Sequence, residues 1–172
     1  MERQYGDLSI REAMPEDAEQ LCRWWNDGAV MAHAGFPNGL GTTTEAILQQ
    51  LEKSRNRIHI ILCKDVPIGE MSYRPLEDGV CEMGIKICDF SMQNQGYGKI
   101  ILSLFITALL DAYGYQKIVL DTNLKNTRAQ HVYEQLGFQK VRINENSWKD
   151  QLGVWQSSVD YELTKDTFIS FL

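Results

Sequence analysis

Apolar positions in this chain switch between a two-residue spacing and a spacing of roughly 3.6 residues, which predicts a mixture of strands and helices. The clearest strand covers residues 80–88, where apolar residues occupy every second position from Met83 to Ile87. The clearest helix follows over residues 99–113, with its apolar residues on one face. Another strand follows at residues 117–121, so we predict a βαβ crossover that makes these two strands parallel neighbours in one sheet.

The remaining pattern completes seven strands and about four helices, antiparallel in the first half of the chain. One helix begins near Pro15, because proline suits the first turn of a helix. Another begins at the capping box formed by Thr42 and Glu45 and ends near Arg55. A polar loop at residues 144–150 separates the last two strands. The predicted strands cover residues 8–11, 57–63, 66–74, 80–88, 117–121, 138–142 and 153–163, and the fourth helix starts near residue 126.

Length and composition indicate one ordinary globular domain over residues 1–172, with residues 164–172 as a tail beyond the pattern. The chain is 44% hydrophobic and 23% charged, and it has no apolar run long enough to span a membrane. The tail carries four apolar residues that we expect to pack on the body of the protein or on a second subunit, so a homodimer is possible. The apolar tail residues are Phe168, Ile169, Phe171 and Leu172.

Charge and cysteine usage narrow the class of function. The net charge of −6 argues against a nucleic-acid binder, which would show a basic patch, and it mildly favours a basic amine as partner. The three histidines lack metal-ligand spacing, so we expect no metal. No Cys-x-x-Cys pair occurs, so we expect four free thiols in a reducing, cytoplasmic location. The four cysteines are Cys22, Cys63, Cys81 and Cys88.

The most informative segment is residues 93–98, Gln-Asn-Gln-Gly-Tyr-Gly, between the strand and the helix described first. Glycine at 96 and 98 lets the backbone approach a ligand closely, and the exposed N–H groups of the following helix favour an anion. The dinucleotide fingerprint fails at Ile101, and no Gly-Lys-Ser/Thr of a P-loop follows. The segment is therefore either an ordinary strand-to-helix turn or a phosphate site of another kind.

This Gln-x-x-Gly-x-Gly resembles the acetyl-CoA-binding signature of the GNAT N-acetyltransferase superfamily. A second block, Asn-Thr-Arg-Ala-Gln-His-Val-Tyr-Glu-Gln-Leu-Gly-Phe at residues 126–138, resembles a later element of the same superfamily. The resemblance covers residues 7–163. It implies an α/β GNAT fold with a seven-stranded mixed sheet and acetyl-CoA as co-substrate. It also implies direct transfer of the acetyl group to an amine of a small molecule or peptide in a ternary complex.

The resemblance also implies which residues hold acetyl-CoA. The pantetheine arm pairs with the strand before the signature at Ile87 and Cys88, and the Cys88 N–H polarises the acetyl carbonyl. The next strand splays away and opens a slot. Asn126 contacts the pantetheine arm, although by its position it can equally cap a helix. The signature residues are Gln93, Gln95, Gly96, Tyr97, Gly98 and Lys99, and the amides of the last five would hold the pyrophosphate.

Two catalytic residues follow from the same resemblance. Tyr133 matches the tyrosine that protonates the leaving thiolate in many members; the alternative is a core tyrosine on an amphipathic helix. Glu82 resembles the strand glutamate that is the general base of the histone acetyltransferase branch; the alternative is an exposed strand carboxylate. Glu70 on the adjacent strand is a rival, and ordered water is a further possibility.

The acceptor site is expected in the loop after the first helix. Trp24-Trp25-Asn26-Asp27 resembles a stretch in the branches that acetylate ribosomal-protein N-termini or the 6′ amine of aminoglycosides. Trp25, Asp27 and Glu70 are the substrate-binding candidates, since aromatic walls and a carboxylate suit a cation. Trp25 as a core residue and Asp27 as a helix-end residue remain alternatives. Polyamine acceptors also stay open, as does a silent GNAT module that senses acyl-CoA.

Overall fold

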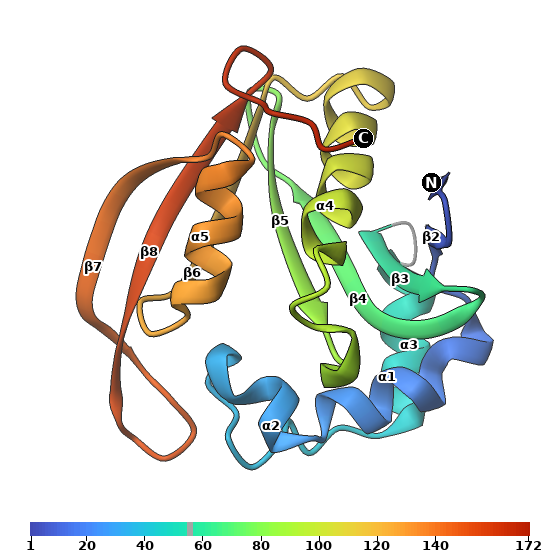
Figure 1. The fold of residues 1–172 in the computed structure, drawn as a ribbon. Coiled ribbons are helices and arrows are strands. Elements are labelled where there is room, and N and C mark those ends of the chain that lie inside the picture. Colours follow the sequence, from blue (N-terminus) through green and yellow to red (C-terminus); the bar gives the residue numbers. More distant parts are fainter. Residues whose placement is uncertain (55–56) are drawn as a thin grey trace.

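One mixed β-sheet carries the helices on its two faces (Figure 1). The computed structural model describes residues 1–54 and 57–172, and its sheet has eight strands in the order β1-β2-β3-β4-β5-β6-β8-β7. All neighbours are antiparallel except β5 and β6, which are parallel, so the predicted crossover is confirmed. The strands are β1 (Glu2–Tyr5), β2 (Leu8–Glu12), β3 (Ile58–Cys63), β4 (Val66–Pro75), β5 (Val80–Ile87), β6 (Lys117–Asn123), β7 (Gln139–Lys149) and β8 (Trp155–Thr164).

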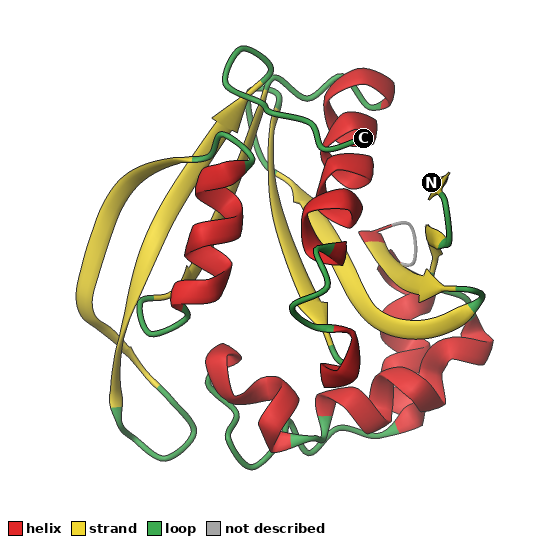
Figure 2. Ribbon diagram, viewed as in Figure 1, coloured by secondary structure: helices red, strands yellow, loops and turns green. Residues whose placement is uncertain are grey.

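The helices divide between the two faces of the sheet (Figure 2). Neighbouring residues of β3 show the division, because Ile61 packs in a hydrophobic cluster with Phe105 of α4, whereas Ile60 packs in a second cluster with Leu21 of α1. Such alternation follows from the pleat of a strand. The α-helices are α1 (Ala18–Trp25), α2 (Gly28–Met31), α3 (Thr44–Ser54), α4 (Tyr97–Thr107) and α5 (Thr127–Gln135).

The sheet has one strand more than the seven predicted. The additional strand is β1, whose four residues are all exposed and polar or amphipathic, so it leaves no hydrophobic alternation to detect. It forms because the turn after Tyr5 folds it back along β2. Strand β7 also runs on to Lys149 through the predicted loop at 144–150. Its side chains are mostly exposed, because β7 lies at an edge of the sheet, where polar residues are typical.

Two helix boundaries differ from the prediction. Helix α3 is capped by Thr43, whose Oγ1 accepts the Ala46 N–H at 3.1 Å, rather than by Thr42. Its predicted end near Arg55 lies outside the described residues. The short helix α2 was not predicted, since a single turn has too few residues to show a period. The helix predicted over residues 99–113 begins at Tyr97 and ends in a π-helical turn, Ala108–Ala112.

The C-terminal tail packs on the body of its own chain, as one of the two predicted alternatives. The Ile169 N–H donates to the Leu136 carbonyl at 2.9 Å, and the Phe171 N–H donates to Ser103 Oγ at 3.0 Å. Phe168 packs against the cluster beneath α4 and α5. The tail therefore links the end of α5 to the middle of α4, and the C-terminus lies beside α4 (Figure 1).

Candidate active site

The glycine turn leaves open space at the start of α4. Gly96 is the N-cap residue and has a φ of +79°, a conformation that favours glycine. A Cβ placed on Gly96 or Gly98 would have no atom within 4 Å. The N-cap glycine has no side chain that could accept from the first-turn N–H groups, so the positive end of the helix dipole is left without a capping side chain. This shape and polarity fit a phosphate group, as the signature predicts.

The polar side chains around the turn hold its backbone in place. Gln93 donates to the Ile87 carbonyl at 3.1 Å, and Gln95 donates to the Ser91 carbonyl at 2.7 Å. Arg128, from the first turn of α5, donates to the Oε1 atom of Gln93. Sequence reasoning missed Arg128. It lies 35 positions after Gln93, and only the packing of α5 beside the glycine turn brings this cation to the edge of the site.

Strands β5 and β6 separate beside the turn. Their ladder pairs only Val80 with Lys117, Cys81 with Ile118 and Glu82 with Val119. Strand β5 continues to Ile87 and β6 to Asn123 without further pairing between them. We call this unpaired stretch the β5–β6 opening. It lies where the resemblance predicts that the two strands splay apart, and the β5 backbone along it is not paired with β6.

The orientation of the β5 backbone corrects one expected role. The Cys88 N–H donates to the Ile68 carbonyl at 2.8 Å, and the Lys86 carbonyl faces Gly69 so closely that a Cβ there would lie 2.2 Å from it. Residues 86 and 88 therefore present their polar backbone groups to β4. Because these groups alternate along a strand, those of Ile87 point away from β4 toward the β5–β6 opening, where the Ile87 carbonyl accepts from the Gln93 side chain. The Cys88 amide does not, and so the expected role of polarising the acetyl carbonyl does not fit it.

Helix α5 carries Asn126 and Tyr133. Asn126 caps the helix, because its Oδ1 accepts the Ala129 N–H at 3.2 Å. Tyr133 is 6% exposed and packs edge-on against the ring of Phe138. Burial, together with the nearby negative charge of Asp121, raises the pKa of Tyr133 to about 12. The hydroxyl thus stays protonated at neutral pH, which a general acid requires.

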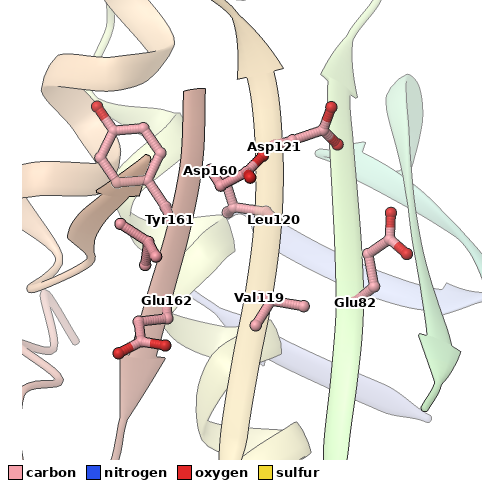
Figure 3. Close-up of a pocket in the computed structure, with 8 residues that line it drawn as sticks. Glu82, Val119, Leu120, Asp121, Asp160, Tyr161 and Glu162 are labelled. Carbon is pink, nitrogen blue, oxygen red and sulfur yellow. The ribbon is translucent and has the colours of Figure 1, made fainter. Parts of the chain in front are cut away.

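A cavity of about 350 Å³ lies on the sheet face opposite α4 and α5 (Figure 3). Four acidic side chains line it, and Glu82 is one of them. Glu82 is paired across the strands with Arg74. The cavity also has an apolar wall that includes Val119 and Val141. We call it the acidic cavity; its carboxylates are Glu82, Asp121, Asp160 and Glu162.

Asp121 is a site candidate that sequence reasoning missed. The residue as a whole is exposed, yet its carboxyl group is partly buried in the acidic cavity. This burial, with the charges of Glu82 and Asp160, raises the pKa of Asp121. A signal was present in the sequence, since Asp121 is the last residue of the predicted parallel strand, and the carboxyl ends of parallel strands commonly form sites.

A second cavity, of about 430 Å³, lies between the helical loops and strands β3 to β5. Trp25 and Glu70, two of the residues predicted to bind the acceptor, both line it. Glu70 is 4% exposed and accepts from Trp25 Nε1 at 3.4 Å and from Lys86 Nζ at 3.0 Å. The charge of Glu70 raises the pKa of Lys86. We call this the loop cavity; Met31, Phe36, Leu40, Arg57, Ser72 and Arg74 also line it.

Asp27 takes the alternative role that the sequence left open. Its Oδ1 accepts the Ala29 N–H at 2.8 Å and caps α2. It is not among the residues that line either cavity. The structure thus brings Trp25 and Glu70 together and leaves Asp27 as a helix-end residue.

The hairpin between β7 and β8 holds the loop that follows α2. The Gln151 N–H donates to the Gly35 carbonyl at 2.8 Å. The Gln151 side chain accepts the Asn38 N–H at 2.9 Å and donates to the Gly39 carbonyl at 2.9 Å. The hairpin and loop are far apart in the sequence, so sequence reasoning missed this contact. The hydrogen bonds at Gly35 and Gly39 hold the loop that forms one wall of the loop cavity.

In residues 1–54 and 57–172, no three His, Cys, Asp or Glu side chains are grouped so that they could hold a metal ion. None of the described helices combines the length and apolar character needed to cross a lipid bilayer.

Comparisons with known proteins agree with the fold. The family model of the GNAT acetyltransferase domain matches residues 7–139. The spermidine N-acetyltransferase from Vibrio cholerae, solved with CoA and spermine, aligns with a TM-score of 0.84 at 16% identity, over 95% of this chain and 98% of that one. A GNAT-family acetyltransferase from Bacillus anthracis aligns with a TM-score of 0.82 at 16% identity, over 96% of this chain and 99% of that one.

A third structure, the ribosomal L7/L12 α-N-protein acetyltransferase RimL in complex with coenzyme A, aligns with a TM-score of 0.82 at 17% identity. The alignment covers 95% of this chain and 97% of that one. A comparison with curated proteins found no match. The structural likenesses establish the fold, and the family model covers more than half of the chain.

Proposed function

This chain belongs to the GNAT acetyltransferase family, and we propose that it moves the acetyl group of acetyl-CoA to a primary amine in a single ternary complex. The observation that carries the proposal is the open glycine turn at the start of α4, beside the β5–β6 opening. A phosphate-binding turn next to an unpaired strand edge fits a long ligand that begins with a pyrophosphate. The resemblance inferred from the two motifs is thus confirmed at the level of the family.

The residues that would hold acetyl-CoA follow from this geometry. The amides of Tyr97, Gly98 and Lys99 face the space where the pyrophosphate fits, and Arg128 adds a positive charge at its edge. The Ile87 N–H faces the β5–β6 opening and is available to the pantetheine arm, whereas the Ile87 carbonyl accepts from Gln93. When bound, acetyl-CoA supplies an acetyl group that is already activated as a thioester, so no covalent enzyme intermediate is required.

The chain's own residues then accept one proton and donate another. The amine must lose a proton before its nitrogen attacks the acetyl carbon, and the sulfur must gain one as the carbon–sulfur bond breaks. Tyr133, neutral because of its raised pKa, donates the second proton. Cys88 is no nucleophile in this scheme, because burial raises the pKa of its thiol to about 12. The transfer is therefore direct.

Asp121 is the base that the geometry supports best. Glu82 is engaged by Arg74, and Glu70 is buried against Lys86, so either would have to give up an ion pair to accept a proton. Asp121 has no ion-pair partner in the described part of the chain, and its raised pKa makes it a stronger base than an ordinary aspartate. We assign Asp121 the role of accepting the proton that the acceptor amine loses.

Two of the related structures support an amine as the acceptor. One was solved with CoA and spermine, and another is described as an α-N-protein acetyltransferase of ribosomal L7/L12. We further propose a cytoplasmic location, which the four free thiols support. A homodimer stays a prediction that light scattering on the purified protein would test.

The test is loss of thioester absorbance from acetyl-CoA, followed with a panel of aminoglycosides, polyamines, amino acids and N-terminal peptides. Turnover with any of these amines would support the proposal. Tight acetyl-CoA binding by calorimetry with no turnover on the whole panel would favour a sensor of acyl-CoA instead. Absence of acetyl-CoA binding would contradict the assignment of the glycine turn.

A further inference from the structure

The C-terminal tail reaches the helix that begins at the glycine turn. The Phe171 N–H donates to Ser103 Oγ at 3.0 Å, and Ser103 is fully buried. Ser103 lies four residues after Lys99 in α4, so the two side chains share one face of the helix. The end of the tail therefore lies along the flank of α4, about one helical turn from the amides that would hold the pyrophosphate (Figure 1).

The ring of Phe171 holds the side chain of Lys99. The Lys99 Nζ atom lies 4.6 Å from the centre of this ring, within the range of a cation–π interaction. Phe171 is 36% exposed, so the ammonium group is held at the surface of the protein rather than in its interior. A free lysine side chain samples many rotamers, and this contact restricts where its charge can lie.

Positive charge gathers around the glycine turn without a compensating carboxylate. The first turn of α4 has no acidic residue and carries Lys99 at the end of the helix where the dipole is already positive. Among the residues that the structure describes, Lys99 has no ion-pair partner, and Arg128 donates to the neutral side chain of Gln93. In a chain with a net charge of −6, two such cations beside a helix N-terminus predict a ligand with several negative charges.

We propose that Lys99, positioned by Phe171, binds the 3′-phosphate of acetyl-CoA, so that the C-terminal tail forms part of the cofactor site. The first amides of α4 point along the helix axis and suit the pyrophosphate. The Lys99 ammonium is held at the flank of the helix instead, and it suits a phosphate displaced from that axis. Acetyl-CoA carries such a phosphate on its ribose. The inference rests on the proposed acetyl-CoA site and adds recognition of the nucleotide half to it.

The test compares acetyl-CoA with acetyl-3′-dephospho-CoA, which lacks only that phosphate. Calorimetry gives the two Kd values for the unaltered protein and for Lys99→Met, which removes the charge and keeps a long side chain. We expect the unaltered protein to bind acetyl-CoA roughly 10- to 100-fold more tightly, the value of a charge-assisted hydrogen bond, and Lys99→Met to bind both about equally. Lys53→Met, at an exposed lysine of α3, is the control and should keep the preference.

Variants of Phe171 separate positioning of the lysine from packing of the tail. Phe171→Leu keeps an apolar contact and removes the ring, whereas Phe171→Tyr keeps the ring. We expect the preference for acetyl-CoA to fall roughly two- to fivefold in Phe171→Leu, the size of an exposed cation–π interaction, and to be retained in Phe171→Tyr. Thermal unfolding measures the stability of each variant. Ile169→Ala, at another exposed tail residue, is the control and should leave the preference unchanged.

The outcomes separate this inference from the proposed function. Equal binding of the two cofactors by the unaltered protein, or an unchanged preference in Lys99→Met, would overturn the 3′-phosphate assignment and leave acetyl transfer intact. A lower melting temperature with an unchanged preference in Phe171→Leu would show that the tail only stabilises the fold, and would remove it from the cofactor site. Absence of acetyl-CoA binding by the unaltered protein would contradict the proposed function itself.

Discussion

At the scale of single residues, burial acts in opposite directions on two titratable side chains. It raises the pKa of Tyr133 to about 12, since the charged form of a tyrosine is the deprotonated one. It lowers the pKa of His59 to about 4, since the charged form of a histidine is the protonated one, and the positive N-terminus adds to this effect. In both cases the apolar surroundings favour the neutral side chain.

Substitution Tyr133→Phe should lower kcat on the order of 10²-fold with little change in acetyl-CoA affinity, because it removes the proton donor and keeps the ring. Steady-state kinetics and calorimetry measure the two quantities. Tyr73→Phe, at another buried tyrosine on β4 outside both cavities, is the matched control and should leave kcat unchanged. An unaltered kcat in Tyr133→Phe would exclude the acid role.

His59 should make the protein less stable in acid. The unfolded state binds a proton near pH 6.5, whereas the folded state binds it only near pH 4. The free energy of unfolding therefore falls as the pH drops from about 6.5 to 4, by an amount of about 3 kcal/mol at most. Urea unfolding across this window measures the slope. His59→Phe should flatten the slope, and an equally steep slope in that variant would assign the effect to other groups.

At the scale of elements, the glycine turn depends on a strand, a turn and a helix in direct succession. Gly96 adopts the positive φ that ends the turn and starts α4. Gly98 lies one residue into the helix, and its φ is not in the left-handed range. The two positions therefore need glycine for different reasons. Gly96 is required by its backbone conformation, and Gly98 keeps space open in front of the first amides of the helix.

Gly98→Val should weaken acetyl-CoA binding by more than about 10-fold while the protein stays folded. A valine there meets no atom of the protein within 4 Å of its Cβ, so its methyl groups would extend into the space proposed for the phosphate. Calorimetry gives the affinity, and thermal unfolding checks the fold. Gly98→Ala is the smaller matched change and should have a lesser effect. Full acetyl-CoA affinity in the valine variant would mean that the phosphates bind elsewhere.

At the scale of the whole molecule, the two halves of the chain meet around the loop cavity. The first half supplies Trp25 and the loop after α2, and the second half supplies the β7–β8 hairpin that holds the loop through Gln151. In the proposed arrangement, the acceptor and the cofactor therefore bind to different parts of the protein. The loop cavity, proposed to take the acceptor, depends on this long-range contact, whereas the glycine turn does not.

Gln151→Ala should raise KM for the acceptor several-fold and leave acetyl-CoA affinity unchanged. The substitution removes two hydrogen bonds that hold the loop, and each typically stabilises by about 1 kcal/mol. Kinetics with varied acceptor at saturating acetyl-CoA measure the effect. Gln139→Ala, on the exposed edge strand, is the control. If acetyl-CoA affinity fell as much as acceptor affinity, the loop would not be specific to the acceptor side.

Local patterns in the sequence were enough for much of the fold. The alternation in residues 80–88, the glycine turn and the amphipathic helix after it are short-range features, because each depends on residues within one or two turns of chain. They predicted the parallel crossover and the family. The strands that were missed or shortened, β1 and the end of β7, are exposed, so no hydrophobic period marked them.

Tertiary structure decided which charged side chains meet around these predicted elements. The sequence by itself determined that a glycine turn precedes a buried helix, and that Tyr133 lies on an apolar face. Which carboxylates form an ion pair, and which do not, depends on neighbours that come from different strands. Glu70 meets Lys86 and Glu82 meets Arg74 only because β4 and β5 pair in one register, and this leaves Asp121 without an ion-pair partner in the described part of the chain. Electrostatic interactions act through space, so no local pattern along the chain encodes them.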